Sequence, residues 1–253
     1  RVSTVGIGHV RYSTRGGNKL ENAQPVLASL NRGSIAIAHN GNISNASQIR
    51  GRMVAEGSIF QSTSDTELML HLIARSRAGG FFPALRETLN ALEGAFSLTM
   101  LHDNSLVAVR DPLGFRPLYI GSDGDTTVVA SETCALDMLR IGDYRTVEPG
   151  EMIVADESGV RSECFASPAR KAQCVFELIY FARPDSSIFG ASVYLMRKRM
   201  GAALAEHDPY EADVVVPVPD SGNVAALGYA EAADTPLELG LTRNHYTGRS
   251  FIL

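Results

Sequence analysis

Three short segments, each reversing at a residue pair suited to a tight turn, constrain the fold more than any other feature of this 253-residue sequence. Aspartate, asparagine and glycine tolerate the backbone angles of a tight reversal, so each segment is predicted to form a β-hairpin. Successive hairpins indicate antiparallel sheets. The segments cover residues 96–110, 118–131 and 151–162, and they turn at Asp103-Asn104, Asp123-Gly124 and Ser158-Gly159.

Two strands and two helices are predicted before the hairpins. Side chains alternate along residues 5–12 and again along residues 34–40, as in half-buried strands. Ser64-Asp65-Thr66-Glu67 is a capping-box pattern, in which the Ser64 hydroxyl bonds the Glu67 amide and the Glu67 carboxylate reaches back. A helix should follow this box, and a second one should span roughly residues 83–92. Strands, two helices and further strands indicate helices packed on antiparallel sheets.

The pattern changes near residue 165. After a polar connector at 167–171, we expect a helix over about residues 191–207, a strand over 213–218 and a helix over about 223–233. The strand carries the run Val214-Val215-Val216, which does not alternate and is therefore predicted to be buried on both faces, as in a parallel sheet. We expect two domains, residues 1–166 and residues 172–253, of which the second is an α/β domain.

Composition excludes several functional classes. Lysine and arginine number 23 against 28 aspartates and glutamates, and a net charge of −5 argues against general nucleic-acid affinity. Neither an apolar stretch of roughly 18 to 20 residues nor a signal-peptide pattern is found, so no membrane partner is expected. Three irregularly spaced cysteines favour a reducing, cytoplasmic location. Because Arg1 and Leu253 lie within regular patterns, we expect the chain to be a fragment.

Three places in the first domain carry residues with chemical potential. Arg11 ends a predicted strand and can clamp a carboxylate with two hydrogen bonds, although an isolated arginine is more often a surface ion-pair partner. Asn40-Gly41 is ordinarily a turn, or else an oxyanion hole made of a side-chain amide and a backbone N–H. Asp65, in the first turn of the capped helix, either complements the helix dipole or holds a substrate ammonium.

Taken in order, these motifs resemble a known family. The stretches Gly8-His9-Val10-Arg11-Tyr12, Ala38-His39-Asn40-Gly41-Asn42, Ser64-Asp65-Thr66-Glu67, Arg110-Asp111-Pro112-Leu113-Gly114-Phe115-Arg116-Pro117-Leu118 and Ala130-Ser131-Glu132 are similar to the glutaminase domain of class II glutamine amidotransferases. Later stretches, Tyr180-Phe181-Ala182-Arg183-Pro184-Asp185-Ser186, Val218-Pro219-Asp220-Ser221 and residues 243–252, resemble the phosphoribosylpyrophosphate amidotransferase branch. The resemblance covers essentially the whole chain.

The resemblance implies a fold and a set of roles for the first domain. The fold would be an α+β N-terminal-nucleophile hydrolase sandwich (αββα, truncated at its start). An N-terminal cysteine would attack the glutamine amide with its own α-amine as base, and Arg1 lies downstream of where that cysteine belongs. Arg11 would bind the glutamine α-carboxylate with Thr14 nearby, and Asp65 would bind the α-ammonium. Asn40 and Gly41 would be the catalytic oxyanion donors.

For the second domain the resemblance implies the beginning of an α/β phosphoribosyltransferase domain. Ser221 matches a magnesium-ligand position, although a turn serine that caps a helix is nearly as good an interpretation. Tyr246 and Arg249, with Arg243 and His245, resemble a loop that closes over phosphoribosylpyrophosphate. Cys174 stands where one branch places the first ligand of a 4Fe-4S cluster, and a buried inert thiol is an equally weighted alternative.

The implied function is the transfer of ammonia from glutamine to phosphoribosylpyrophosphate, the first step of purine biosynthesis. Glutamine, phosphoribosylpyrophosphate and Mg²⁺ would be its ligands, with a 4Fe-4S cluster as an open alternative and a homo-oligomer as the full-length form. The chain itself is expected to be inactive in both half-reactions. Two alternatives stay open: another class II amidotransferase, and a non-catalytic regulator that binds glutamine or phosphoribosylpyrophosphate.

Overall fold

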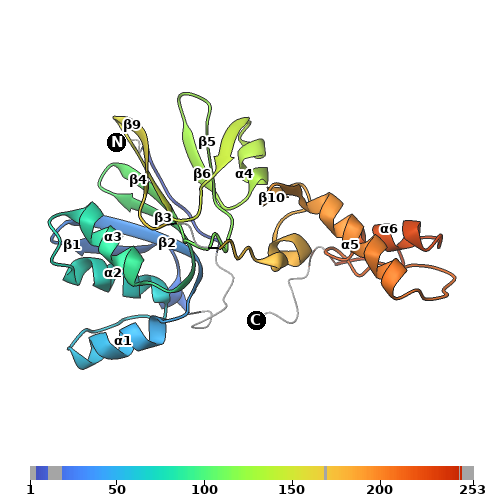
Figure 1. The fold of residues 1–253 in the computed structure, drawn as a ribbon, viewed down its shortest axis with the longest axis horizontal. Helices are drawn as coiled ribbons and strands as arrows, with labels where there is room; N and C mark the ends of the chain where they lie inside the picture. The colour runs from blue at the N-terminus through green and yellow to red at the C-terminus, as the bar shows by residue number, and fades with distance from the viewer. Residues whose placement is uncertain (1–3, 11–18, 168–169, 245, 247–253) are drawn as a thin grey trace. The chain divides into compact units, whose positions relative to one another are not determined.

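The computed structural model describes residues 4–10, 19–167, 170–244 and 246 (Figure 1). The chain divides into two compact units, which we call the N-terminal unit (residues 1–131 and 140–173) and the C-terminal unit (residues 132–139 and 174–253). The polypeptide therefore crosses between the units three times, at 131/132, 139/140 and 173/174. Each unit is described by itself below.

A six-stranded antiparallel sheet forms the centre of the N-terminal unit. The predicted hairpins at Asp103-Asn104 and Ser158-Gly159 are confirmed, and Asp103 (φ +50°) and Gly159 (φ +113°) adopt the left-handed angles that the turns require. In spatial order the strands are β1 (Val26–Leu30), β2 (Gly33–Ile43), β3 (Gly94–His102), β4 (Ser105–Arg110), β8 (Glu151–Asp156) and β9 (Gly159–Cys164).

Three helices, α1 (Ala46–Ala55), α2 (Asp65–Arg75) and α3 (Phe81–Ala91), gather on one side of this sheet (Figure 1). Alternate residues of the strands, such as Ile37 in β2 and Leu98 in β3, join the apolar faces of the helices in one buried cluster. A short 3-10 helix, η1 (Leu20–Asn22), precedes β1. The helix–sheet layer expected from the period-2 and period-3.6 patterns is therefore present.

A second, three-stranded antiparallel sheet has the order β6-β5-β7, formed by β6 (Thr127–Ala130), β5 (Tyr119–Ser122) and β7 (Asp143–Thr146). The predicted hairpin at Asp123-Gly124 is confirmed as β5–β6, with Gly124 at φ +100°. Ala108 and Ile153 of the larger sheet share a buried cluster with Leu118 and Ile120 of the smaller one. The N-terminal unit is thus layered as helices, sheet and sheet.

Two local predictions for the N-terminal unit are wrong. Residues 5–10 alternate in burial as expected but are not part of a strand, because a strand is defined by a regular ladder of backbone hydrogen bonds and not by alternation alone. The capping box is not reciprocal, since the Ser64 hydroxyl accepts from the Thr66 N–H. The Glu67 carboxylate instead accepts from the N–H groups of Gln61 and Ser62, so it caps the preceding loop.

The C-terminal unit is mainly helical. Its largest contact is between α5 and α6, where a Cβ on Gly201 would lie 1.8 Å from the Ala225 carbonyl oxygen and one on Gly228 would lie 1.9 Å from the Lys198 oxygen. Among the described residues, no helix has both the length and the apolar character needed to cross a bilayer. The elements are α4 (Thr133–Met138), the π-helix η2 (Glu177–Phe181), β10 (Ser187–Ile188), β11 (Ala191–Ser192), α5 (Val193–His207) and α6 (Asn223–Ala232).

The prediction of a strand buried on both faces at residues 213–218 is also wrong. Val215 forms a single parallel bridge with Leu237, and Val214 and Val216 are each 40% exposed rather than buried on both faces. A strand is buried on both faces only when strands flank it and helices cover both sides. The described part of the chain provides one bridging residue in place of those neighbours.

Candidate functional site

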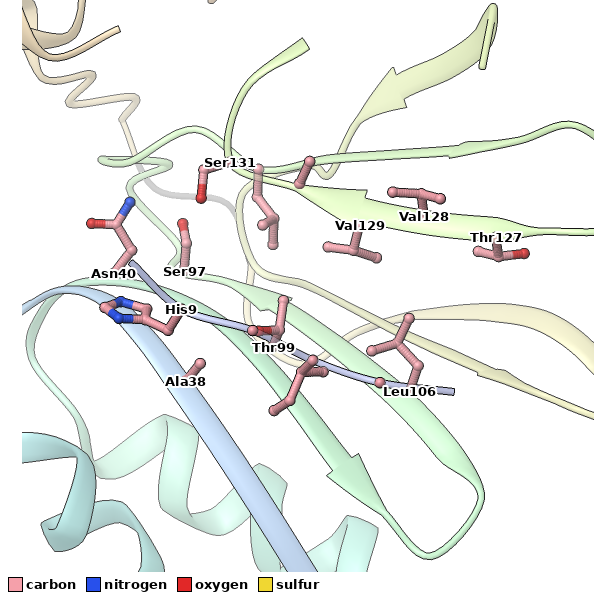
Figure 2. A pocket seen from close by; sticks show the side chains of 15 residues that line it. His9, Ala38, Asn40, Ser97, Thr99, Leu106, Thr127, Val128, Val129 and Ser131 are labelled. Carbon is pink, nitrogen blue, oxygen red and sulfur yellow. The ribbon is translucent and has the colours of Figure 1, made fainter. Parts of the chain in front are cut away.

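A cavity of about 280 Å³ lies between the two sheets of the N-terminal unit (Figure 2). Asn40, Ser97 and Ser131 present their polar groups at one end of it, and Leu106 and Val129 line the wall farther along. Residues 6–9 complete the lining. Thr99 and Thr127 add hydroxyl groups along the same wall, so the cavity has polar groups at one end and a mixed lining beyond it, which suits a small polar molecule.

The strand alternation of β2 separates Asn40 from its neighbour His39. Ala38 and Asn40 face the cavity, whereas His39 faces the helices with Ile35 and Ile37. The predicted oxyanion residue Asn40 is therefore positioned by the pleat of a central strand. Its side-chain amide can donate to a carbonyl oxygen at the polar end of the cavity.

Among the residues that the structure describes, none forms a strand beside one edge of β2 at its C-terminal end. Pairing with β1 stops at the Val26–Ile37 pair, and two of the amides beyond it donate to side chains instead. The His39 N–H donates to Gln24 Oε1 at 2.6 Å, and the Ile43 N–H donates to Asp65 Oδ2 at 3.2 Å.

The N–H of Gly41 lies between these two donors and points to the same edge. Its partner across the β2–β3 ladder, Phe96, turns its own N–H and carbonyl toward Asp111, so Gly41 and Phe96 form a non-hydrogen-bonded pair. Within the described ranges we find no acceptor for the Gly41 N–H. The edge thus presents one unused donor held in place between two occupied ones, and a preorganised donor of this kind is what an oxyanion hole is built from.

Glycine is needed at position 41 for two reasons. Its φ is +155°, an angle that L side chains rarely adopt, and a Cβ there would lie 2.1 Å from the Ala95 carbonyl oxygen. The residue that would supply the backbone donor is therefore also the one that allows β2 and β3 to approach at this point.

Asp65 is fixed to the same edge. One carboxylate oxygen lies 3.3 Å from His39 Nδ1 and the other accepts from Ile43, and the side chain is only 15% exposed. Burial alone would raise the pKa of Asp65, but the hydrogen bond and charge of His39 and the Ile43 amide outweigh it, so the pKa is lowered. The structure places this carboxylate on the edge of β2 to which the Gly41 N–H also points, although Asp65 does not itself line the cavity.

Sequence reasoning assigned no role to His39 or Gln24. His39 is buried, and its Nε2 lies 3.3 Å from the Ala95 carbonyl oxygen, so an acceptor faces each ring nitrogen. A signal was available, because His39 is a polar residue on a strand face otherwise occupied by Ile35 and Ile37. Gln24 precedes β1, and no local pattern marks it.

The predicted residues of the C-terminal unit lie on exposed chain. Ser221 stands in the turn before α6, next to Asp220, whose carboxylate accepts from Arg243 at 2.7 Å. Tyr246 is fully exposed, and its N–H donates to Asn244 Oδ1. The remaining predicted contacts, Arg11, Thr14 and Arg249 together with His245, lie outside the described residues.

No preformed metal cluster is found in the part of the chain that the structure describes, where no three His, Cys, Asp or Glu side chains come together. Cys174 is half-buried, and all three cysteines carry free thiols. One thiol does not fit a 4Fe-4S cluster, which takes four. The Ser221 hydroxyl has the oxygen chemistry that Mg²⁺ prefers, but it is a single donor.

Comparison with known proteins supplies a family. A family model described as a glutamine amidotransferase domain matches residues 9–138, about half of the chain. A chloroplastic amidophosphoribosyltransferase of Glycine max is 51% identical over 98% of this chain, and the amidophosphoribosyltransferase of Bacillus subtilis is 48% identical over 97%. These matches cover 44% and 52% of the two relatives, so the chain spans about half of their length.

Two solved structures match over 97% of this chain and 53% of their own. One, described as the allosteric regulatory enzyme of purine biosynthesis, gives a TM-score of 0.90 at 47% identity. The other, a glutamine phosphoribosylpyrophosphate amidotransferase from B. subtilis complexed with ADP and GMP, gives 0.89 at 47% identity. The expected N-terminal-nucleophile hydrolase sandwich is confirmed, and the start of a second α/β domain stays a prediction.

Proposed function

The chain belongs to the glutamine amidotransferase family, and from that premise we propose that it is part of an enzyme that transfers ammonia from glutamine to phosphoribosylpyrophosphate. The relatives that are similar to nearly the whole chain bear the name amidophosphoribosyltransferase, which supports this acceptor over those of other class II amidotransferases. The observation that carries the glutaminase half is the unused Gly41 N–H, held beside the Asp65 carboxylate on the open edge of β2.

In the glutaminase half, glutamine is held by opposite charges and reacts at its side-chain amide. Asp65, ionised because its pKa is lowered, binds the α-ammonium, while Arg11 binds the α-carboxylate with Thr14 nearby. Attack on the amide carbon puts negative charge on its oxygen. The Asn40 amide and the Gly41 N–H donate to that oxygen, and such a donor is worth about 10²–10³ in rate.

The nucleophile is a cysteine thiolate activated by its own α-amine, and it comes from outside the cavity lining, which contains no cysteine in the described residues. Its sulfur bonds to the amide carbon, the C–N bond breaks, and nitrogen leaves as ammonia after taking a proton. Water then hydrolyses the thioester to glutamate.

In the second half-reaction, ammonia forms a C–N bond at the ribose anomeric carbon while the C–O bond to pyrophosphate breaks. Mg²⁺, when bound, neutralises the leaving diphosphate, and the Ser221 hydroxyl would be one of its ligands. Tyr246 and Arg249 would cover the substrate, with Arg249 binding phosphate. Cys174 would supply one of the four thiolates that a 4Fe-4S cluster takes, so a cluster would need three further cysteines of the full-length protein.

The test uses the full-length protein that contains this chain. Purified protein is incubated with phosphoribosylpyrophosphate, Mg²⁺ and either glutamine or ammonium, and pyrophosphate and glutamate are measured. We expect glutamate and pyrophosphate in equal amounts with glutamine, and pyrophosphate alone with ammonium. If the protein is inactive with both nitrogen sources but binds glutamine or phosphoribosylpyrophosphate, the alternative of a non-catalytic regulator would replace this proposal.

A further inference from the structure

Two sequence motifs that have no role in the proposed mechanism meet inside the C-terminal unit. Glu132 ends the stretch Ala130-Ser131-Glu132, and Arg183 and Ser186 belong to the Tyr180–Ser186 string. One carboxylate oxygen of Glu132 accepts from the Arg183 backbone N–H and from the Ser186 hydroxyl, both at 2.8 Å. Residues 51 and 54 positions apart in the sequence are thereby held together.

The contact is specific for the turn rather than for a positive charge. The Arg183 guanidinium pairs with Asp185 through two bonds of 3.0 and 2.7 Å, so Glu132 holds the main chain of the turn. The Ser187 N–H donates to Thr133 Oγ1 at 2.8 Å and extends the contact by one residue on each side. Thr133 and Ser186 are each 1% exposed, so the bonds that they make are partly buried, while the bond from the Arg183 N–H lies at the surface.

The neighbour of Glu132 in the chain gives this contact its significance. Ser131 lines the polar end of the cavity with Asn40 and Ser97 (Figure 2), and the chain crosses from the N-terminal to the C-terminal unit at the next peptide bond. Consecutive Cα atoms are about 3.8 Å apart, so the anchoring of Glu132 limits where Ser131 can lie. A movement of the 183–187 turn that displaces Glu132 therefore also displaces Ser131 in the cavity lining, because one peptide bond joins the two residues.

We propose that Glu132 is a positioning residue that couples the glutamine cavity to the phosphoribosyl-transferring unit. The proposal rests on the proposed function, because it assumes that the two units carry the two half-reactions. Glu132 touches neither substrate. Because its carboxylate is hydrogen-bonded to the 183–187 turn, Glu132 fixes the position of the neighbouring Ser131. The rate of the glutamine-dependent reaction therefore responds to the conformation of the C-terminal unit. The reaction within the C-terminal unit does not require these hydrogen bonds.

The test compares full-length Glu132→Ala, Glu132→Gln and Ser186→Ala proteins with wild type. Glu157→Ala is the matched control, because Glu157 is exposed in the β8–β9 turn. The readout is the rate of pyrophosphate release with glutamine divided by the rate with ammonium, both at saturating phosphoribosylpyrophosphate. Exchange of the Arg183 amide hydrogen is followed in parallel, because it reports the hydrogen bonds between Glu132 and the turn without any activity.

We expect the ratio to fall at least about fivefold in Glu132→Ala, with the ammonium rate within twofold of wild type. Glu132→Gln keeps an acceptor oxygen and should restore most of the ratio, Ser186→Ala should lose about threefold, and Glu157→Ala should lose nothing. Equal losses of both rates, or no change in the ratio, would overturn the proposal. If Glu132→Ala does not fold, the ratio of glutamine-dependent to ammonium-dependent rates in Ser186→Ala tests the proposal instead.

Failure of the proposed function has a different signature. Wild-type protein would then release pyrophosphate with neither nitrogen source. Exchange of the Arg183 amide would still be faster in Glu132→Ala than in the Glu157→Ala control if Glu132 holds the turn. Unchanged exchange of the Arg183 amide would show that the hydrogen bonds between Glu132 and the 183–187 turn do not form in solution.

Discussion

Two segments that carry residues expected to act on substrate, one in each unit, are held by different means. In the N-terminal unit, β2 from Ala38 to Ile43 is paired with β3 along its whole length, and its free edge is secured by Gln24 and Asp65. In the C-terminal unit, residues 213–222 are held by one parallel bridge at Val215 and by backbone bonds around it.

This difference separates a rigid site from one that depends on further contacts. A donor fixed by a ladder costs little reorganisation when charge develops on the substrate, which is what electrostatic stabilisation needs. A phosphate-binding turn can instead gain order from its ligand, because exposed backbone is free to adjust. We therefore expect substitutions near β2 to affect catalysis sharply and substitutions near 213–222 to affect stability little.

The largest effect is expected for Gly41→Ala. The new Cβ would meet the Ala95 carbonyl oxygen at 2.1 Å, and φ would be held at +155°, so the strand must shift and misplace the donor. We expect the kcat of glutamine hydrolysis to fall at least about hundredfold. Steady-state glutamate release by the full-length protein measures this, with ammonium-dependent turnover retained.

Gly159→Ala is the matched control for Gly41→Ala. Gly159 also has a positive φ, +113°, but nothing lies within 4 Å of the added Cβ in the exposed β8–β9 turn. A modest loss of stability with normal kcat is expected. If both variants lost glutaminase activity equally, general destabilisation rather than the oxyanion donor would explain the result for Gly41.

At two glycines that lie in helices, substitution by alanine should change the free energy of unfolding in opposite directions. Gly201 lies in the α5–α6 contact, where a Cβ would be 1.8 Å from the Ala225 carbonyl oxygen, so Gly201→Ala should destabilise the C-terminal unit by about 3 kcal/mol. Gly51 is exposed on α1 with nothing within 4 Å, so Gly51→Ala should stabilise the N-terminal unit by up to about 1 kcal/mol. Urea unfolding followed by amide exchange in α1 and α5 measures both.

The same contrast explains how much of the fold could be predicted from sequence. The hairpins were correct because a turn residue such as Asp103 and the alternation around it act over a few residues. The run Val214–Val216 was misinterpreted because burial on both faces depends on neighbouring strands that no local pattern reveals. Residues 5–10 show the same limit, since their burial alternates although they are not part of a strand.

The residues of the candidate site could be predicted from the sequence to about the same extent as the fold. Asn40, Gly41 and Asp65 could be named from motifs, because glycine at a strand end and a carboxylate at a helix start each have a local physical reason. The use of His39 to hold Asp65 could not, because it depends on how α2 packs on β2. Long-range contacts of this kind leave only a weak trace, here one polar residue on an apolar face.

Replacing the Asp65 carboxylate should give an intermediate effect. Asp65→Asn keeps the shape and an acceptor for the Ile43 N–H but removes the charge that would pair with the α-ammonium. We expect the KM for glutamine to rise about tenfold, since a hydrogen bond to a charged group contributes roughly 1.5 to 3 kcal/mol. Glutamate release at varied glutamine concentration measures it, and an unchanged KM would remove Asp65 from the substrate site.

The same variant tests the lowered pKa of Asp65. A carboxyl whose folded pKa lies below its ordinary value stabilises the fold fully above that ordinary value and loses the contribution as the pH falls through the lowered one. The stability gap between wild type and Asp65→Asn should therefore narrow on acidification. Asp156→Asn is the control, because the Ser158 hydroxyl and Arg161 lower the pKa of Asp156 to about 2 on an exposed hairpin that does not line the cavity.

The smallest effect is expected for Arg243→Gln, which breaks the exposed pair with Asp220. That pair is shorter than the His39–Asp65 pair, 2.7 Å against 3.3 Å, but its side chains are 53% and 57% exposed against 1% and 15%. Water screens the exposed charges, so its loss should change the free energy of unfolding by less than about 0.5 kcal/mol. A larger loss in urea unfolding would mean that residues 213–222 are secured by their ion pair rather than left to be ordered by a ligand, and the contrast with β2 would then not hold.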